Sequence, residues 1–232
     1  MSKTTSYILC IETANAVTSA AISKNGECLV VKEVLESNKA ADKLHVLIAD
    51  LLAAAGLSFA DLNAVAISAG PGSYTGLRIA AAAAKGYCFS LDIPLISIST
   101  LEAMVEGIQT RYNQLGFDEY VPMIDARRME VFTSFYTKAK EKELLKAFTS
   151  LILDDTFEDL LDKNRKYLLF GNGAEKATVI LKNDKATLFS GFIPSAQDLC
   201  SMADASFQNE KFEDVAYFEP HYLKAFFSTQ KN

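Results

Sequence analysis

The chain has 232 residues, half of them apolar, which is enough for one large domain or two small ones with a substantial core. Its formal net charge of −6 disfavours tight direct binding of nucleic acid by this chain alone. The polar N-terminus, the lack of a long apolar run and four cysteines without a C-x-x-C pair predict a cytoplasmic protein with no membrane contact, disulfide framework or metal site.

The first half of the chain is predicted to begin with three strands, over Tyr7–Thr13, Thr18–Ser23 and Glu27–Leu35. Leucines that recur at helical spacing then predict a helix over Ala40–Ala55. The remaining elements are a strand at Ala64–Ser68, a turn at Gly70–Gly76, a helix at Leu77–Leu91, a strand at Pro94–Ser99 and a helix at Thr100–Gln109.

The second half is predicted to repeat this order more loosely. Its elements are strands at Val121–Asp125, Met129–Tyr136 and Glu143–Leu153, a helix at Asp155–Leu161, a strand at Lys166–Phe170, and helices at Glu175–Leu181 and Ala196–Ser206. Three strands followed by helix, strand and helix, occurring twice, resemble the duplicated ribonuclease-H-like domains of actin, heat-shock-70 and sugar-kinase (ASKHA) proteins. We therefore predict an α/β fold with mixed sheets flanked by helices, divided into domains 1–110 and 111–232, the C-terminal tail packing back.

The most informative segment is the loop after the strand at Ala64–Ser68. It contains Gly70, Pro71, Gly72, Ser73, Tyr74, Thr75, Gly76, Leu77 and Arg78. Glycines allow close approach of another group, and amides at a helix start favour an anion, so a phosphate or a partner's backbone is one interpretation. A tight strand-to-helix turn is the other. The spacing matches neither a P-loop, nor a dinucleotide fingerprint, nor a nucleophile elbow.

The predicted helix after this loop contains the run Ala80–Ala84, whose small side chains allow another helix to approach closely. Alanine is also simply the best helix former. Its combination with Gly86, Tyr87 and Cys88 favours an interface with a second chain.

Several motifs, in order and at similar separations, resemble the TsaB (YeaZ) family. They are Glu12-Thr13-Ala14, the loop Gly70–Arg78, Pro94-Leu95-Ile96 with Ser99-Thr100-Leu101, and Ile124-Asp125-Ala126-Arg127 with Glu130-Val131. Beyond Val131 the resemblance rests on Gly171-Asn172-Gly173 and Pro220–Leu223.

This resemblance implies a non-catalytic accessory subunit in the synthesis of N6-threonylcarbamoyladenosine at position 37 of tRNA. The implied partners are a TsaD-type catalytic subunit and a TsaE-type ATPase, with tRNA engaged through the complex and a homodimer in isolation. Contacts are expected on the helices Ala40–Ala55 and Leu77–Leu91. The expected contact residues are Leu44, Leu51, Gly70, Pro71, Gly72, Ser73, Tyr74, Thr75, Gly76, Arg78, Ala81, Ala84, Lys85 and Tyr87.

The resemblance also distinguishes this chain from the catalytic subunit. TsaD-type proteins hold a metal with a H-x-x-x-H pair, and the matching positions here are Thr100 and Met104, which do not replace histidine ligands. We expect no catalytic residue and no cofactor bound by this chain alone. Glu12 and Thr13 remain nucleotide candidates, and ATP or ADP at the interface with the partner is the alternative.

Two other functions fit the predicted fold less well. A small-molecule kinase of the ASKHA fold needs two phosphate loops that are incomplete here, and a glycoprotease-like peptidase lacks both H-E-x-x-H and a recognisable Ser/His/Asp set. Arg127 and Arg128 form a local basic site, interpreted as a solvated face, with contact to tRNA or the partner left open.

Overall fold

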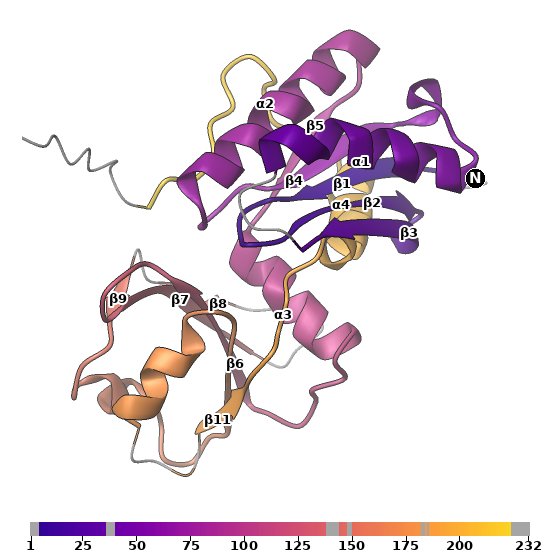
Figure 1. The fold of residues 1–232 in the computed structure, drawn as a ribbon. Coiled ribbons are helices and arrows are strands. Elements are labelled where there is room, and N and C mark those ends of the chain that lie inside the picture. The colour runs from indigo at the N-terminus through magenta and orange to yellow at the C-terminus, as the bar shows by residue number, and fades with distance from the viewer. Residues whose placement is uncertain are drawn as a thin grey trace, which may run out of the picture.

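The structure, a computed structural model, describes residues 5–35, 40–137, 144–147, 150–181, 184 and 186–223, which form two sheets with a helix between them (Figure 1). The first sheet contains β1 (Tyr7–Glu12), β2 (Thr18–Lys24), β3 (Glu27–Val34), β4 (Ala64–Ser68) and β5 (Leu95–Ile98), in the order β3-β2-β1-β4-β5. Strands β1, β2 and β3 pair antiparallel, whereas β1, β4 and β5 pair parallel.

Both faces of the first sheet are covered. The helices α1 (Ala40–Ala55) and α2 (Tyr74–Leu91) pack on one face, and α4 (Cys200–Gln208) with the short 3₁₀ helix η4 (Ala196–Leu199) packs on the other. Alternation along β1 explains the two cores, because Leu9 faces α1 and α2 while Cys10 faces α4. A further 3₁₀ helix, η1 (Phe59–Asp61), precedes β4.

The second sheet repeats the connectivity of the first. It contains β6 (Glu119–Asp125), β7 (Glu130–Thr137), β8 (Leu144–Ala147), β10 (Tyr167–Phe170) and β11 (Ala186–Phe189), in the order β11-β10-β6-β7-β8, with β9 (Leu151–Ile152) also paired to β7. As in the first sheet, the first three strands pair antiparallel, here β6 with β7 and β7 with β8. Strand β10 then pairs parallel with both β6 and β11. The predicted α/β fold of two ribonuclease-H-like sheets is therefore confirmed.

The helix α3 (Thr100–Thr110) lies between the two sheets (Figure 1). Its side chains Leu101, Met104 and Ile108 pack on the second sheet, and Ala103 belongs to the core beneath the first. The other face of the second sheet is covered by the 3₁₀ helices η2 (Phe157–Leu160) and η3 (Ala174–Val179).

Several predicted elements of the second half were wrong in type or extent. The helices predicted at Asp155–Leu161 and Glu175–Leu181 are the short 3₁₀ helices η2 and η3, and the strand predicted over Glu143–Leu153 is divided into β8 and β9. Strand β11 was not predicted. In the first half, α2 begins at Tyr74 and not at Leu77, because Ser73 caps it by accepting a hydrogen bond from the amide of Gly76 at 3.3 Å.

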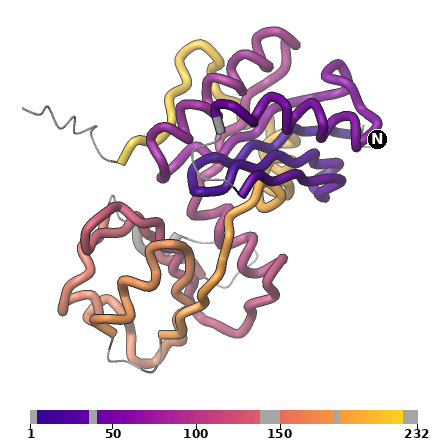
Figure 2. Tube along the Cα trace, viewed as in Figure 1, coloured from indigo at the N-terminus to yellow at the C-terminus, as the bar shows by residue number. Residues whose placement is uncertain are grey.

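The end of the described chain returns to the first sheet. The amide of Glu213 donates to the carbonyl oxygen of Leu95 at 2.9 Å, and Phe218 is buried beside α1 and α2. Figure 2 shows this yellow stretch running beside α2. The division into domains 1–110 and 111–232 stays a prediction. None of the helices within the described ranges has the length and apolar content required to cross a membrane.

Candidate functional site

Three glycines allow backbone to approach backbone here: Gly70 and Gly72 in the loop before α2, and Gly76 in its first turn. A Cβ added to Gly76 would lie 1.9 Å from the carbonyl oxygen of Thr13, and one added to Gly72 would lie 2.5 Å from that of Ala14. Gly70 has a φ of +113°, and its added Cβ would lie 2.7 Å from the carbonyl oxygen of His221. The interpretation as a tight strand-to-helix turn therefore accounts for all three glycines.

Hydrogen bonds hold this loop on three sides. The amide of Ser73 donates to the carbonyl oxygen of Ala14 at 2.7 Å, which ties the loop to the end of β1. The amide of Thr100 donates to the carbonyl oxygen of Gly70 at 3.0 Å, which ties it to α3. The amide of His221 donates to the carbonyl oxygen of Ala69 at 2.7 Å, which adds the C-terminal stretch. The loop is thus the point where four separate segments meet.

The two nucleotide candidates are occupied within the chain. Glu12 is 1% exposed, and its carboxylate accepts hydrogen bonds from the amide of Ala14 at 2.6 Å and from the hydroxyl of Ser68. Burial, opposed by these hydrogen bonds, raises the pKa of Glu12 to about 7. The hydroxyl of Thr13 donates to the carbonyl oxygen of Gly76 at 2.7 Å. Nucleotide binding through these side chains stays a prediction.

Five of the expected contact residues are buried within the chain itself, and their contact with a partner stays a prediction. They are Leu44, Leu51, Ala81 and Ala84, which belong to the core beneath α1 and α2, and Gly76, which is buried in the first turn of α2. The four side chains pack on the first sheet because helical periodicity directs this apolar face inward.

The remaining expected contact residues vary in exposure. Gly70 and Pro71 are buried, Gly72, Tyr74, Lys85 and Tyr87 are half-buried, and Ser73, Thr75 and Arg78 are exposed. The ammonium of Lys85 donates to the carbonyl oxygens of Ala216 at 2.9 Å and Phe218 at 3.2 Å, so it anchors the C-terminal stretch to α2.

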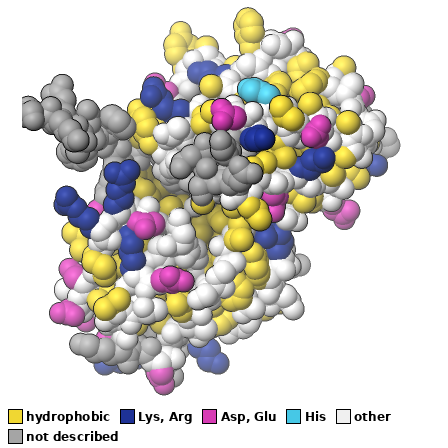
Figure 3. Space-filling model, in the orientation of Figure 1, with side chains coloured by type: hydrophobic (Ala, Val, Ile, Leu, Met, Phe, Trp, Pro, Cys, Tyr) yellow, Lys and Arg dark blue, Asp and Glu magenta, His cyan; other side chains and the backbone are white. Residues whose placement is uncertain are grey.

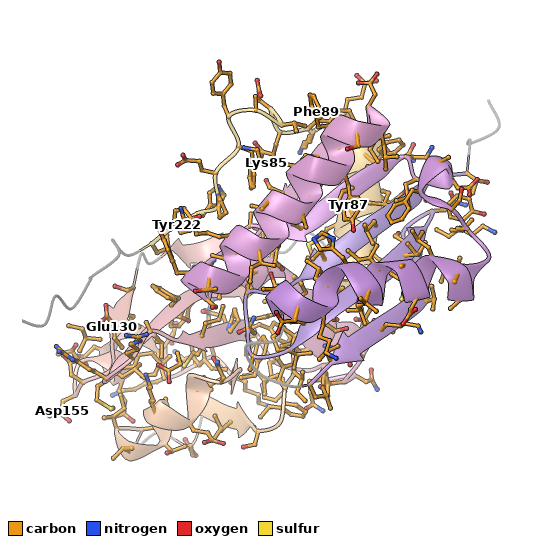
Figure 4. All side chains as sticks on the ribbon, turned by 45° about the horizontal axis from the view of Figure 1, so that its top comes forward. Lys85, Tyr87, Phe89, Glu130, Asp155 and Tyr222 are labelled. Atoms are coloured by element: carbon orange, nitrogen blue, oxygen red, sulfur yellow. The ribbon has the colours of Figure 1, made fainter. Side chains whose placement is uncertain are left out.

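An aromatic stack lies at the start of α2. The guanidinium of Arg78 lies 5.0 Å from the ring centre of Tyr74, which lies 4.9 Å from that of Tyr222. Figure 4 places Tyr222 beside the first turn of α2. The stack therefore joins the exposed beginning of α2 to the C-terminal stretch.

A second contact group joins α2 to α1. The hydroxyl of Tyr87 lies 2.8 Å from Nδ1 of His45, and the Tyr87 ring stacks on Phe59 at 5.2 Å between ring centres. His45 is exposed, and its contact with the hydroxyl positions Tyr87.

Sequence reasoning missed two exposed apolar side chains on these helices. Phe89 is 85% exposed on α2 and Val46 is 60% exposed on α1. Figure 4 shows Phe89 near the end of α2, pointing away from the sheet, and Figure 3 shows apolar and charged side chains mixed over this part of the molecule. The sequence pattern could have indicated both residues, because at 3.6 residues per turn they lie outside the buried face of their helices.

Arg127 and Arg128 lie in the turn between β6 and β7, where both have positive φ values, 70° and 51°. Both side chains are exposed. The turn is held by Asp125, which accepts from the amide of Arg127 at 2.6 Å and from the ammonium of Lys176 at 2.6 Å. Within the described ranges, no group of three or more His, Cys, Asp or Glu side chains is arranged to hold a metal ion.

Comparison with known proteins agrees with this architecture. A family model described as "TsaD: tRNA N6-adenosine threonylcarbamoyltransferase" matches residues 34–230. The chain is 30% identical to the tRNA threonylcarbamoyladenosine biosynthesis protein TsaB of Bacillus subtilis (94% of this chain, 93% of the relative) and 28% identical to that of Escherichia coli (94% of each). The solved structure of YeaZ from Pseudomonas aeruginosa superposes with a TM-score of 0.78 at 25% identity, covering 94% of this chain and 99% of that one. The chain therefore belongs to the TsaB family of tRNA threonylcarbamoyladenosine biosynthesis proteins.

Proposed function

We propose that this chain is a non-catalytic subunit that supports a TsaD-type threonylcarbamoyltransferase in the modification of tRNA in the cytoplasm. Its proposed partners are the TsaD-type subunit and a TsaE-type ATPase, and tRNA is reached through the assembled complex. The net charge of −6 supports an indirect contact with tRNA. In isolation, two copies of the chain are proposed to pair through helices α1 and α2.

The non-catalytic part of this proposal rests on the contacts of two side chains of α3. The two positions where a TsaD-type protein is expected to hold metal-binding histidines are Thr100 and Met104. The hydroxyl of Thr100 accepts a hydrogen bond from the amide of Gly70 at 3.2 Å, and Met104 is 1% exposed against the second sheet. Both side chains have structural roles here, and the sequence's two histidines, His45 and His221, lie elsewhere.

The face formed by α1 and α2 is proposed as the contact with the partner. Its core-directed side chains hold the two helices on the sheet, while Val46 on α1 and Phe89 near the end of α2 remain exposed, as does Arg78 near its start. Exposed aromatic and arginine side chains are typical of the residues that dominate binding energy at interfaces. Because Glu12 and Thr13 are occupied within the chain, we place ATP or ADP at the joint interface with the partner.

The first experiment is size-exclusion chromatography with light scattering, on this chain alone and mixed with the TsaD-type protein of the same organism. We expect a new species at the summed mass. Mass spectrometry of tRNA nucleosides should show no modification by this chain alone, and loss of modification when it is omitted from the reconstituted complex. Modification by this chain alone would contradict the non-catalytic assignment.

A matched pair of variants tests the contact face. Phe89→Asp should weaken the affinity for the TsaD-type protein at least about tenfold, since it places a charge in a desolvated contact. Val179→Asp, at a side chain 80% exposed on η3, is the control and should bind normally. Equal binding by both variants, with both folded by circular dichroism, would remove Phe89 from the interface.

A further inference from the structure

Three cysteines lie between the first sheet and α4, and the proposed function does not use them. Cys28 on β3 and Cys200 at the start of α4 line the same pocket. Cys10 and Cys200 belong to the same buried core. The fourth cysteine, Cys88, lies in the core on the opposite face of the sheet.

A β-bulge directs Cys28 toward α4. The register of β2 and β3 shifts between Ile22 and Ser23, so that Cys28 lies directly opposite Ser23. Residues directly opposite in an antiparallel pair carry their side chains on the same face. The hydroxyl of Ser23 donates to the carbonyl oxygen of Cys200 at 3.3 Å, so this face is the one that α4 covers. Backbone pairing thus places Cys28 over the first turn of α4.

The members of this pair differ in access. Cys28 is exposed, whereas Cys200 is 2% exposed beneath it. Both line a surface pocket of about 280 Å³, together with Arg111, Gln197 and Ser201. A small molecule that enters this pocket reaches the exposed thiol with the second thiol alongside.

We propose that Cys28 and Cys200 are a modification site that forms an intramolecular disulfide when the protein meets a peroxide. Hydrogen peroxide transfers one oxygen to the exposed Cys28 sulfur, giving a sulfenic acid and one water. The Cys200 sulfur then attacks the Cys28 sulfur, the S–O bond breaks, and the departing hydroxide takes the Cys200 proton as a second water. Two thiols and one peroxide become one disulfide and two waters.

The surroundings of the thiols determine the rate of this reaction. The interaction with Cys200, together with burial, raises the pKa of Cys28. The interaction with Cys10, together with burial, raises the pKa of Cys200 against the opposing effect of Cys28. The thiolate, which is the reactive form, is therefore scarce near neutral pH. The disulfide accumulates under sustained exposure to peroxide, and more quickly at alkaline pH.

The experiment is a thiol count on the folded full chain after treatment with hydrogen peroxide. The protein is then denatured and alkylated, and its peptides are analysed by mass spectrometry without reduction. We expect free thiols to fall from four to two, with Cys28 joined to Cys200, a monomer on non-reducing gels, and four thiols again after reduction.

Two serine variants separate this outcome from others. Cys88→Ser should still form the link, and Cys28→Ser, at an exposed position that does not endanger folding, should keep its three thiols. A covalent dimer joined through Cys28, a link between Cys10 and Cys200, or Cys28 oxidised beyond the sulfenic acid without a link would each overturn the proposal.

Discussion

The two sheets share one structural unit, a strand end beside a glycine loop, but the side chains around it differ. In each, the first strand ends in a carboxylate, Glu12 on β1 and Asp125 on β6, beside a glycine loop that follows a parallel strand. A Cβ added to Gly72 would lie 2.5 Å from the carbonyl oxygen of Ala14, and one added to Gly173 would lie 3.0 Å from the amide of Asp125. The repeated connectivity therefore reproduces the contact between loop and strand end.

The two carboxylates nevertheless have opposite environments. Glu12 is buried among neutral hydrogen-bond donors, and burial raises its pKa to about 7. Asp125 is exposed, and although partial burial acts in the other direction, its hydrogen bonds with Lys176 and the amide of Arg127 lower its pKa. The comparison teaches that equivalent topology sets where a group lies, while the side chains packed around it set its charge.

The largest effect is expected from Gly76→Ala, which tests the close approach in the first unit. Alanine normally stabilises a helix, but here the added Cβ would lie 1.9 Å from the carbonyl oxygen of Thr13. We expect a loss of about 3 kcal/mol or more in the free energy of unfolding, measured by urea denaturation. Gly86→Ala on the same helix is the control, since its Cβ would meet nothing within 4 Å. That variant should be as stable as the parent or more stable, and similar stability of both variants would show that the loop moves away freely.

The pH dependence of stability tests the buried carboxylate. The folded protein holds the Glu12 proton more tightly than the unfolded chain does, since the pKa rises from 4.5 to about 7. The contribution of Glu12 to the free energy of unfolding is full below pH 4.5 and is lost as pH rises through 7, a change of about 3 kcal/mol. Glu12→Gln imitates the protonated form and should flatten this decline, measured by urea midpoints at a series of pH values. An unchanged slope would mean that Glu12 titrates normally.

The smallest effect is expected at the equivalent carboxylate of the second sheet. The pKa of Asp125 is lowered on folding, so its contribution is present above its ordinary value of 3.8 and is lost as pH falls through the folded value. Because the group is exposed, Asp125→Asn should cost less than about 1 kcal/mol at neutral pH and reduce only the acid limb of the stability curve. A loss as large as that at Gly76 would contradict the contrast between the two units.

The predictions from sequence were best where local pattern and local structure coincide. Helix α1 was predicted with its observed ends, because its leucines recur at helical spacing and Gly56, with a φ of +67°, follows its last residues. They were weakest in the second half, where η2 and η3 are short 3₁₀ helices and β11 pairs with β10. Acidic and apolar residues over seven positions do not separate a 3₁₀ turn from an α-helix.

For the proposed contact surface, the sequence indicated a segment but not which of its atoms are exposed. It pointed to the loop Gly70–Arg78 and to the two helices, yet it included Leu44 and Ala84, which are buried, and omitted Phe89, which is open. Periodicity shows that a helix has an apolar face. Phe89 lies outside that face, but whether it stays uncovered depends on how the whole helix is placed on its sheet.

The sequence by itself determined the order of strands and helices in the first half, the repeat of that order, and the motifs that identify the family, since each depends on residues close together along the chain. The tertiary structure alone decided that Glu12 is buried, that Lys85 holds the C-terminal stretch, and that Cys28 and Cys200 line one pocket. Each of these depends on strand pairing and on helix packing between distant segments. Burial, partners and charge state follow from those contacts, and no local pattern records them.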